Sequence, residues 1–174
     1  LFSMCPFITE IRCAPEVTSF FEELSYSEQT EWVEELLSRT TYEKGNVSVC
    51  LFDTGITSGH PLLTPATDIN HIQAVNTAWG SGDHQGHGTE MAGVALFFDL
   101  KQALESSNPI SISHEIESVK ILPPTGGNLP ELYGAITEQA VSLAEISNPN
   151  SKRIICMAVT APDYNTSDGS PTSW

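Results

Sequence analysis

The chain has 174 residues and carries 7 Lys or Arg against 22 Asp or Glu, which gives a formal net charge of −15. This length is sufficient for a single domain with a sizeable core. The acidic balance argues against nucleic acid or an anionic membrane surface as the main partner, and no apolar run approaches the roughly 20 residues of a membrane-spanning helix.

Residues 1–45 are predicted to form an N-terminal helical segment, or the end of a preceding domain. A short strand and a first helix are expected before residue 25. Ser25 and Glu28 then have the spacing of a capping box, which predicts the start of a second helix with one apolar and one acidic face. We expect a helical hairpin packed on the next domain, and the tail of a regulatory domain is the alternative.

Residues 46–174 form the second predicted unit, which follows a linker at residues 39–45. Its first element is the apolar, β-branched run at residues 47–52, which indicates a buried strand. The run ends in Asp53. Open α/β sheets place their functional sites at the carboxyl ends of such strands, so Asp53 is a candidate functional carboxylate.

Residues 86–95 read GHGTEMAGVA, a histidine between two glycines at the start of a helix that is expected to end near residue 98. Small residues, Gly93 included, let this helix sit close against a sheet, and the flanking glycines leave the imidazole of His87 uncrowded. The positive end of the helix dipole is expected to disfavour the imidazolium and keep a neutral ring available as a base. Such a base needs an orienting carboxylate, and Asp53, 34 residues earlier, is the candidate.

The remaining predicted elements alternate between strand and helix. A strand is expected at residues 69–75 and another at 112–122, followed by a helix at 129–146 and a strand at 154–159. Strands that alternate with helices and short turns are typical of a parallel sheet with right-handed crossovers. The sequence therefore predicts an α/β fold with a parallel sheet.

Cysteine usage bears on the compartment. The four cysteines show neither C-x-x-C spacing nor the spacing of zinc ligands, and they are Cys5, Cys13, Cys50 and Cys156. The last two fall in runs predicted as buried strands, where a free cysteine behaves as a small apolar residue. This usage favours a reduced, cytoplasmic protein, and secretion with two disulfides stays open as the alternative.

Several separated motifs of the chain resemble those of the subtilisin-like serine peptidases, and they occur in that family's order. Residues 49–55 resemble the strand and D-[ST]-G motif of the catalytic aspartate, and residues 55–61 resemble the G-I-x-x-x-H-P that follows. Residues 87–93 match H-G-T-x-[VM]-A-G around the catalytic histidine, and residues 154–160 resemble the strand whose end lines the substrate cleft. The resemblance covers the chain from about residue 47 onward.

The resemblance implies a doubly wound, subtilisin-like α/β fold and hydrolysis of peptide bonds by an Asp-His-Ser triad, with Asp53 as the acid and His87 as the base. It also implies that extended peptide or protein substrates pair with residues at the position of the family's S-[LFM]-G. Those residues are Ala158, Val159 and Thr160, of which two depart from the pattern. Substrate specificity is therefore not transferable from the family.

The family's G-T-S-x-[AS] motif, which carries the catalytic serine, does not occur in the sequence, and neither does its oxyanion-hole asparagine. We therefore expect the chain to be the first half of a peptidase domain, inactive alone and dependent on the remainder of the same domain for the serine. The alternative is a catalytically dead, subtilase-like binding module that keeps the cleft and lacks the nucleophile.

A metal site is the third possibility for the region around the histidine. Four potential ligands are closely spaced there, namely Asp83, His84, His87 and Glu90. The zincin pattern H-E-x-x-H is absent, however, and the loop before the helix is rich in glycine. We expect neither a metal nor another cofactor.

Overall fold

The computed structural model describes residues 21, 23–43 and 45–159 of the chain. The short strand expected before residue 15 lies outside these residues, as does most of the first expected helix. Within the described part, no helix combines the length and the apolarity that crossing a bilayer would need.

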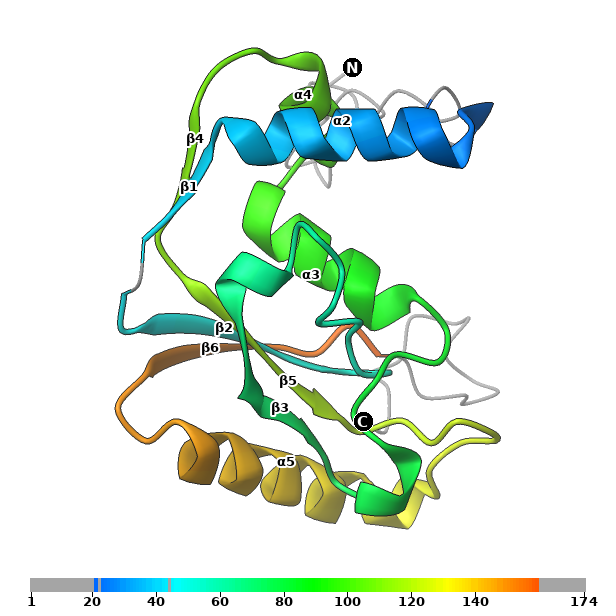
Figure 1. Ribbon diagram of the computed structural model, residues 1–174. Coiled ribbons are helices and arrows are strands. Elements are labelled where there is room, and N and C mark those ends of the chain that lie inside the picture. Colours follow the sequence, from blue (N-terminus) through cyan, green and yellow to red (C-terminus); the bar gives the residue numbers. More distant parts are fainter. Residues whose placement is uncertain (1–20, 22, 44, 160–174) are drawn as a thin grey trace, which may run out of the picture.

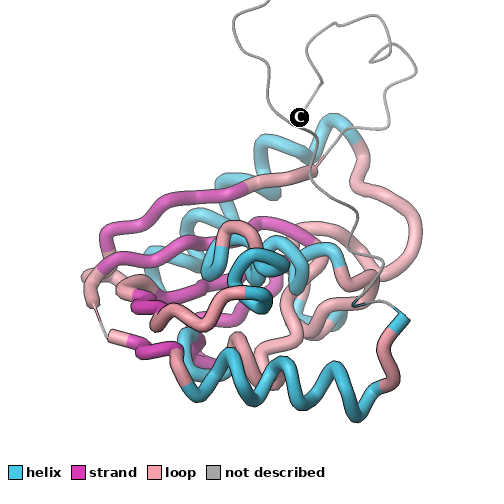
Figure 2. The backbone as a smooth tube through the Cα atoms, turned by 90° about the horizontal axis from the view of Figure 1, so that it is seen from above, coloured by secondary structure: helices cyan, strands magenta, loops and turns pink. Residues whose placement is uncertain are grey.

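A sheet of four parallel strands forms the centre of the molecule (Figure 1, Figure 2), with the order β3-β5-β2-β6. Strand β2 lies inside the sheet and pairs with β5 on one side and with β6 on the other. The strands are β2 (Val47–Asp53), β3 (Thr67–Ala74), β5 (Glu115–Lys120) and β6 (Lys152–Cys156). This arrangement, with helices between the strands, confirms the predicted α/β class.

Helices cover both faces of the sheet, as Figure 1 shows. Helices α3 (His87–Phe97) and α4 (Leu100–Glu105) lie on one side, and α5 (Tyr133–Ser147) lies on the other. Side chains of β2 alternate between two cores: Leu51 belongs to the core with α3, whereas Cys50 and Phe52 belong to the core with α5. Burial on both faces explains why β2 is a continuous apolar run.

Three short 3₁₀ helices lead into or out of these elements. They are η1 (Thr64–Ala66), η2 (Thr77–Trp79) and η3 (Pro130–Leu132). The last of them occupies the start of the helix that we predicted from residue 129, so α5 itself begins at Tyr133.

Two predictions about strands were wrong. The run at residues 112–122 is not one strand, because it contributes to β4 (Ile110–Ile112) and β5, which belong to different sheets. Strand β4 pairs in parallel with β1 (Thr40–Tyr42), which lies in the segment that we predicted to be a linker. Both errors have one cause: β1 and β4 are stabilised by each other's backbone across about 70 residues, and this pairing leaves no local pattern.

Helix α2 (Tyr26–Ser38) begins at the predicted capping box. The Ser25 backbone amide donates to the Glu28 carboxylate at 2.8 Å, and the Glu28 amide donates back to the Ser25 hydroxyl at 3.4 Å. Leu36 on its apolar face is fully buried in the same core as Leu51 and Ala92. The acidic helix is therefore packed onto the rest of the structure, and most of the other helix of the expected hairpin lies outside the described residues.

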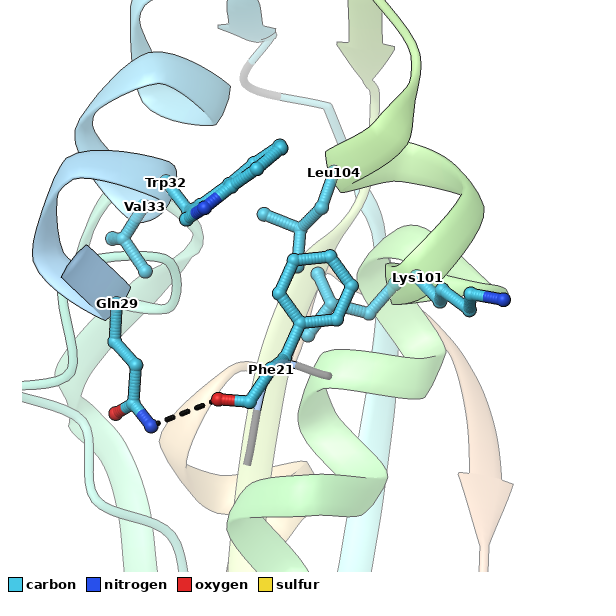
Figure 3. Close-up of a pocket in the computed structure, with 7 residues that line it drawn as sticks. Phe21, Gln29, Trp32, Val33, Lys101 and Leu104 are labelled. Atoms are coloured by element: carbon cyan, nitrogen blue, oxygen red, sulfur yellow. Dashed lines mark hydrogen bonds between the residues drawn. The ribbon is translucent and has the colours of Figure 1, made fainter. Parts of the chain in front are cut away.

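An apolar groove of about 330 Å³ lies between α2 and α4 (Figure 3). The rings of Phe21 and Trp32 meet edge to face across it, with centroids 5.4 Å apart. The groove is lined by Phe21, Gln29, Trp32, Val33, Leu100, Lys101 and Leu104. Neither Asp53 nor His87 is among these residues, so the groove is separate from the predicted site.

Cys50 and Cys156 are free thiols on opposite faces of the sheet, since they belong to different cores. Burial, together with the nearby Glu117 carboxylate, raises the pKa of the Cys50 thiol to about 12. Cys50 therefore behaves as the small apolar core residue that we predicted. Cys5 and Cys13 lie outside the described residues.

Candidate active site

Asp53 and His87 are held at the ends of two regular elements. Asp53 is the last residue of β2, and its side chain is 2% exposed. His87 is the first residue of α3, and its side chain is 46% exposed. The parallel sheet thus presents a buried carboxylate at its carboxyl edge, and the helix start places a solvent-accessible imidazole beside it.

The structure brings these two predicted site residues into direct contact. Nδ1 of His87 lies 2.9 Å from Oδ1 and 3.0 Å from Oδ2 of Asp53. The Thr54 backbone amide also donates to Oδ1 of Asp53, at 2.7 Å, and so fixes the carboxylate. An ionised carboxylate only accepts hydrogen bonds, so Nδ1 of His87 carries the proton of this contact and Nε2 is left as the basic nitrogen.

Two glycines allow α3 to approach the end of β2. A Cβ atom at Gly88 would lie 2.0 Å from the carbonyl oxygen of Gly55, so only glycine fits this contact. Gly55 itself has a φ of 96°, which favours glycine. By contrast, a Cβ at Gly93 would meet no atom within 4 Å. The expected close approach is therefore made at the first turn of the helix, and Gly93 does not contribute to it.

The pKa of His87 is raised above its usual value. The hydrogen bond to Asp53 is the largest cause, it outweighs the opposing effect of burial, and the charges of Glu90 and Asp83 act in the same direction. We expected the helix dipole to favour the neutral ring, and the net direction is the opposite. Three nearby carboxylates stabilise the imidazolium more than burial of the ring disfavours it.

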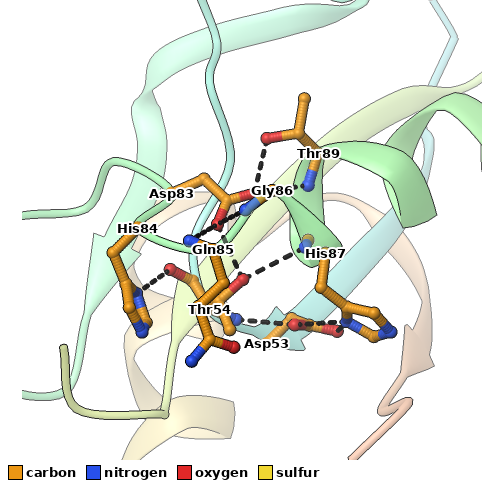
Figure 4. A network of polar contacts seen from close by, with 9 residues as sticks. Asp53, Thr54, Asp83, His84, Gln85, Gly86, His87 and Thr89 are labelled. Carbon is orange, nitrogen blue, oxygen red and sulfur yellow. Dashed lines mark hydrogen bonds and ion pairs between the residues drawn. The ribbon is translucent and has the colours of Figure 1, made fainter. Parts of the chain in front are cut away.

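Asp83 organises the loop before α3 through a network that sequence reasoning missed (Figure 4). Its carboxylate accepts five hydrogen bonds from backbone amides and hydroxyls, from Thr54, Gln85, Gly86 and, twice, Thr89. Burial alone would raise the pKa of Asp83, but these bonds outweigh it and hold that pKa well below its usual range. An aspartate in a glycine-rich loop just before a helix was the available signal, because such residues bond the backbone ahead of them.

The four residues considered as possible metal ligands do not converge. The carboxylate oxygens of Asp83 accept hydrogen bonds from the loop and from the start of α3. Nδ1 of His84 lies 3.1 Å from the Thr54 carbonyl oxygen. Within the described residues, no group of three or more His, Cys, Asp or Glu side chains is arranged to hold a metal ion.

The predicted substrate-binding residues follow the end of β6. The strand ends at Cys156, so it is shorter than the strand that we expected at residues 154–159. Ala158 is exposed, Val159 packs against the core with α5, and Thr160 lies outside the described residues.

Comparison with protein-family models matches residues 44–174 to the model of the subtilase family. The matched region contains β2, α3 and β6 and hence both members of the hydrogen-bonded pair. Searches of curated proteins and of solved structures each found no match.

Proposed function

The chain belongs to the subtilase family of serine peptidases, and we propose that Asp53 and His87 are the acid and the base of an Asp-His-Ser triad that hydrolyses peptide bonds. The observation that carries this proposal is the contact between a buried carboxylate and a half-exposed imidazole, with Nδ1 of His87 2.9 Å from Asp53. This is the geometry that an orienting acid and a general base need.

In this mechanism Asp53 holds His87 in the tautomer with a proton on Nδ1. Nε2 then accepts the proton of a serine hydroxyl while the serine oxygen attacks the substrate carbonyl carbon. The imidazolium that forms is stabilised by the Asp53 carboxylate. It returns the proton to the leaving amine, and a water molecule afterwards hydrolyses the acyl-enzyme by the same path.

We assign the serine to a further part of the peptidase domain, because the G-T-S-x-[AS] motif does not occur in these 174 residues. We likewise propose that residues 158–160 bind an extended peptide by strand addition. The exposure of Ala158, just beyond the last strand of the sheet, supports this role.

The test uses the polypeptide that includes the serine, a peptide substrate and a fluorophosphonate probe of serine nucleophiles. His87→Ala is expected to lower kcat by about 10⁴-fold or more and to abolish labelling. His84→Ala, in the loop that precedes α3, is the matched control and is expected to change kcat by less than about tenfold.

The 174-residue chain alone is expected to remain unlabelled. A larger loss at His84 than at His87 would refute the assignment of the base. A folded polypeptide that has the whole domain but no serine of the G-T-S-x-[AS] motif, binds peptides and neither labels nor cleaves would favour the binding-module alternative.

A further inference from the structure

The residues that follow the acid and the base are joined by a buried hydrogen bond. Thr54 comes directly after Asp53 and is 1% exposed, and Gly88 comes directly after His87. The Gly88 backbone amide donates to the Thr54 hydroxyl oxygen at 3.1 Å. This bond ties the end of β2 to the first turn of α3, one residue away from the contact between Asp53 and His87.

Asp83 fixes the direction of that bond. The Thr54 hydroxyl donates its single proton to Oδ1 of Asp83 at 2.8 Å, so its lone pairs are free to accept from Gly88. Oδ2 of Asp83 accepts from the Thr89 amide at 2.8 Å and the Thr89 hydroxyl at 2.6 Å. One carboxylate thus bonds to the end of β2 and to the start of α3 (Figure 4).

We propose that Asp83 is a positioning residue for the base, which acts through Thr54 to hold α3 at the distance where His87 meets Asp53. This role rests on the proposed peptidase function. Within the described residues, Asp83 makes no hydrogen bond to the side chain of Asp53 or His87, so it sets the position of the imidazole without taking part in proton transfer.

Lys120 anchors the loop from the sheet side. Its side chain is 1% exposed, it lies opposite Asp53 in the register of β2 and β5, and its Nζ donates to the Gly82 carbonyl oxygen at 2.8 Å. Burial lowers the pKa of Lys120, and the charge of Asp83 partly offsets this effect. The loop that carries Asp83 is therefore bonded to a buried lysine of strand β5.

The charge of Asp83 and its hydrogen bonds have separable consequences. Glu90 also raises the pKa of His87 through its charge, but within the described residues it does not bond to Thr54 or Asp83. Glu90→Gln therefore removes a comparable charge and leaves the network intact. Thr54→Val does the reverse, since it removes the hydroxyl and keeps the shape and the charge.

The first test measures kcat and KM in the polypeptide that includes the serine. Asp83→Asn and Thr54→Val are expected to lower kcat about 10- to 100-fold with KM changed less than about threefold, the loss typical of a misplaced reacting group. Thr54→Ser keeps the hydroxyl and is expected to restore most of kcat. Glu90→Gln is expected to keep kcat within about threefold.

The pH profile separates charge from position. Asp83→Asn and Glu90→Gln are both expected to move the acidic limb of kcat/KM to lower pH, because each removes a charge that raises the pKa of His87. Thr54→Val is expected to move that limb to lower pH as well, because it weakens the hydrogen bond to Asp53 that raises the pKa of His87 most, but unlike Glu90→Gln it also lowers kcat. If the kcat losses merely match the fraction of unfolded protein, or if Thr54→Ser is as impaired as Thr54→Val, positioning by this network is refuted.

A second test does not depend on hydrolysis and so distinguishes failure of this proposal from failure of the proposed function. The proton on Nδ1 of His87 is observed by NMR, and its exchange with solvent is expected to be at least about tenfold faster in Asp83→Asn and Thr54→Val than in the original chain and in Glu90→Gln. Equal exchange in all four proteins would overturn the positioning role even if peptidase activity is found. Faster exchange without any peptidase activity would support it while the proposed function fails.

Discussion

Substitution of Gly88 by alanine is expected to separate the base from the acid. The new Cβ would lie 2.0 Å from the Gly55 carbonyl oxygen and 3.3 Å from the Thr54 hydroxyl. Restoring an ordinary contact of 3.4 Å with the Gly55 oxygen requires the helix start to move by about 1.4 Å. The contact between His87 and Asp53 is already 2.9 Å, so such a movement takes it beyond hydrogen-bonding range.

The expected result of Gly88→Ala is a loss of kcat on the order of 10²-fold, the cost of a misplacement of about 1 Å, with a loss of stability of about 1–3 kcal/mol from overpacking. Peptide hydrolysis measures the loss of kcat, and urea unfolding measures the loss of stability. The matched control is Gly93→Ala in the same helix, where the new Cβ meets no atom within 4 Å. This control is expected to keep kcat and to gain about 0.5–1 kcal/mol from helix propensity.

A Gly88→Ala protein that remains folded and keeps kcat within about threefold would refute the reasoning, because the close approach would then not set the geometry of the pair. A loss of kcat in Gly93→Ala equal to that in Gly88→Ala would refute it as well. That result would point to the rigidity of α3 and not to its contact with the end of β2.

Three further predictions concern the pair and the core. In a double-mutant cycle, His87→Ala and the double variant with Asp53→Asn should have nearly equal kcat, and additive losses would show that the two residues do not act as a unit. Asp53 raises the pKa of His87, so the protonated pair stabilises the fold fully below the usual histidine pKa of 6.5. This stabilisation is lost as the pH rises through the folded-state pKa. The unfolding free energy lost in His87→Gln should therefore be greater at pH 5 than at pH 9. Cys50, whose pKa is raised to about 12, should resist iodoacetamide at pH 8 until the chain unfolds, as peptide mapping would show, and modification of Cys50 in the folded protein would contradict its burial.

Asp53 and His87 could be predicted as candidate site residues from the sequence because each stands at the end of an element with a strong local pattern. Asp53 ends an apolar run that is buried on both faces, and His87 follows a glycine that ends a loop. The residues that mark such boundaries lie within a few positions of one another in the chain. The strand end and the helix start already made Asp53 the candidate partner of His87, 34 positions away, and the likeness to subtilases implied their roles as acid and base.

The features that were missed depend on contacts between distant segments. Strand β1 exists because β4 supplies its backbone partner, and the break between β4 and β5 follows from their membership of different sheets. Asp83 drew attention only as a possible metal ligand, because its bond to the Thr54 hydroxyl, which joins the loop to the end of β2, forms only when β2 and α3 meet. The direction of the pKa shift of His87 was missed for the same reason. Carboxylates at three separate positions, Asp53, Asp83 and Glu90, together raise this pKa.

The relative sizes of the forces indicate what holds the pair together. With the imidazole 46% exposed, an ion pair between His87 and Asp53 is worth about 1 kcal/mol or less, which is too little to draw a helix against a sheet. A Cβ atom inserted at the contact between Gly55 and Gly88 would cost about 1–3 kcal/mol, and burying Thr54 without its partners costs a similar amount. The backbone contact and the hydroxyl network therefore fix the position of α3, and the hydrogen bond between the acid and the base is a consequence of that position.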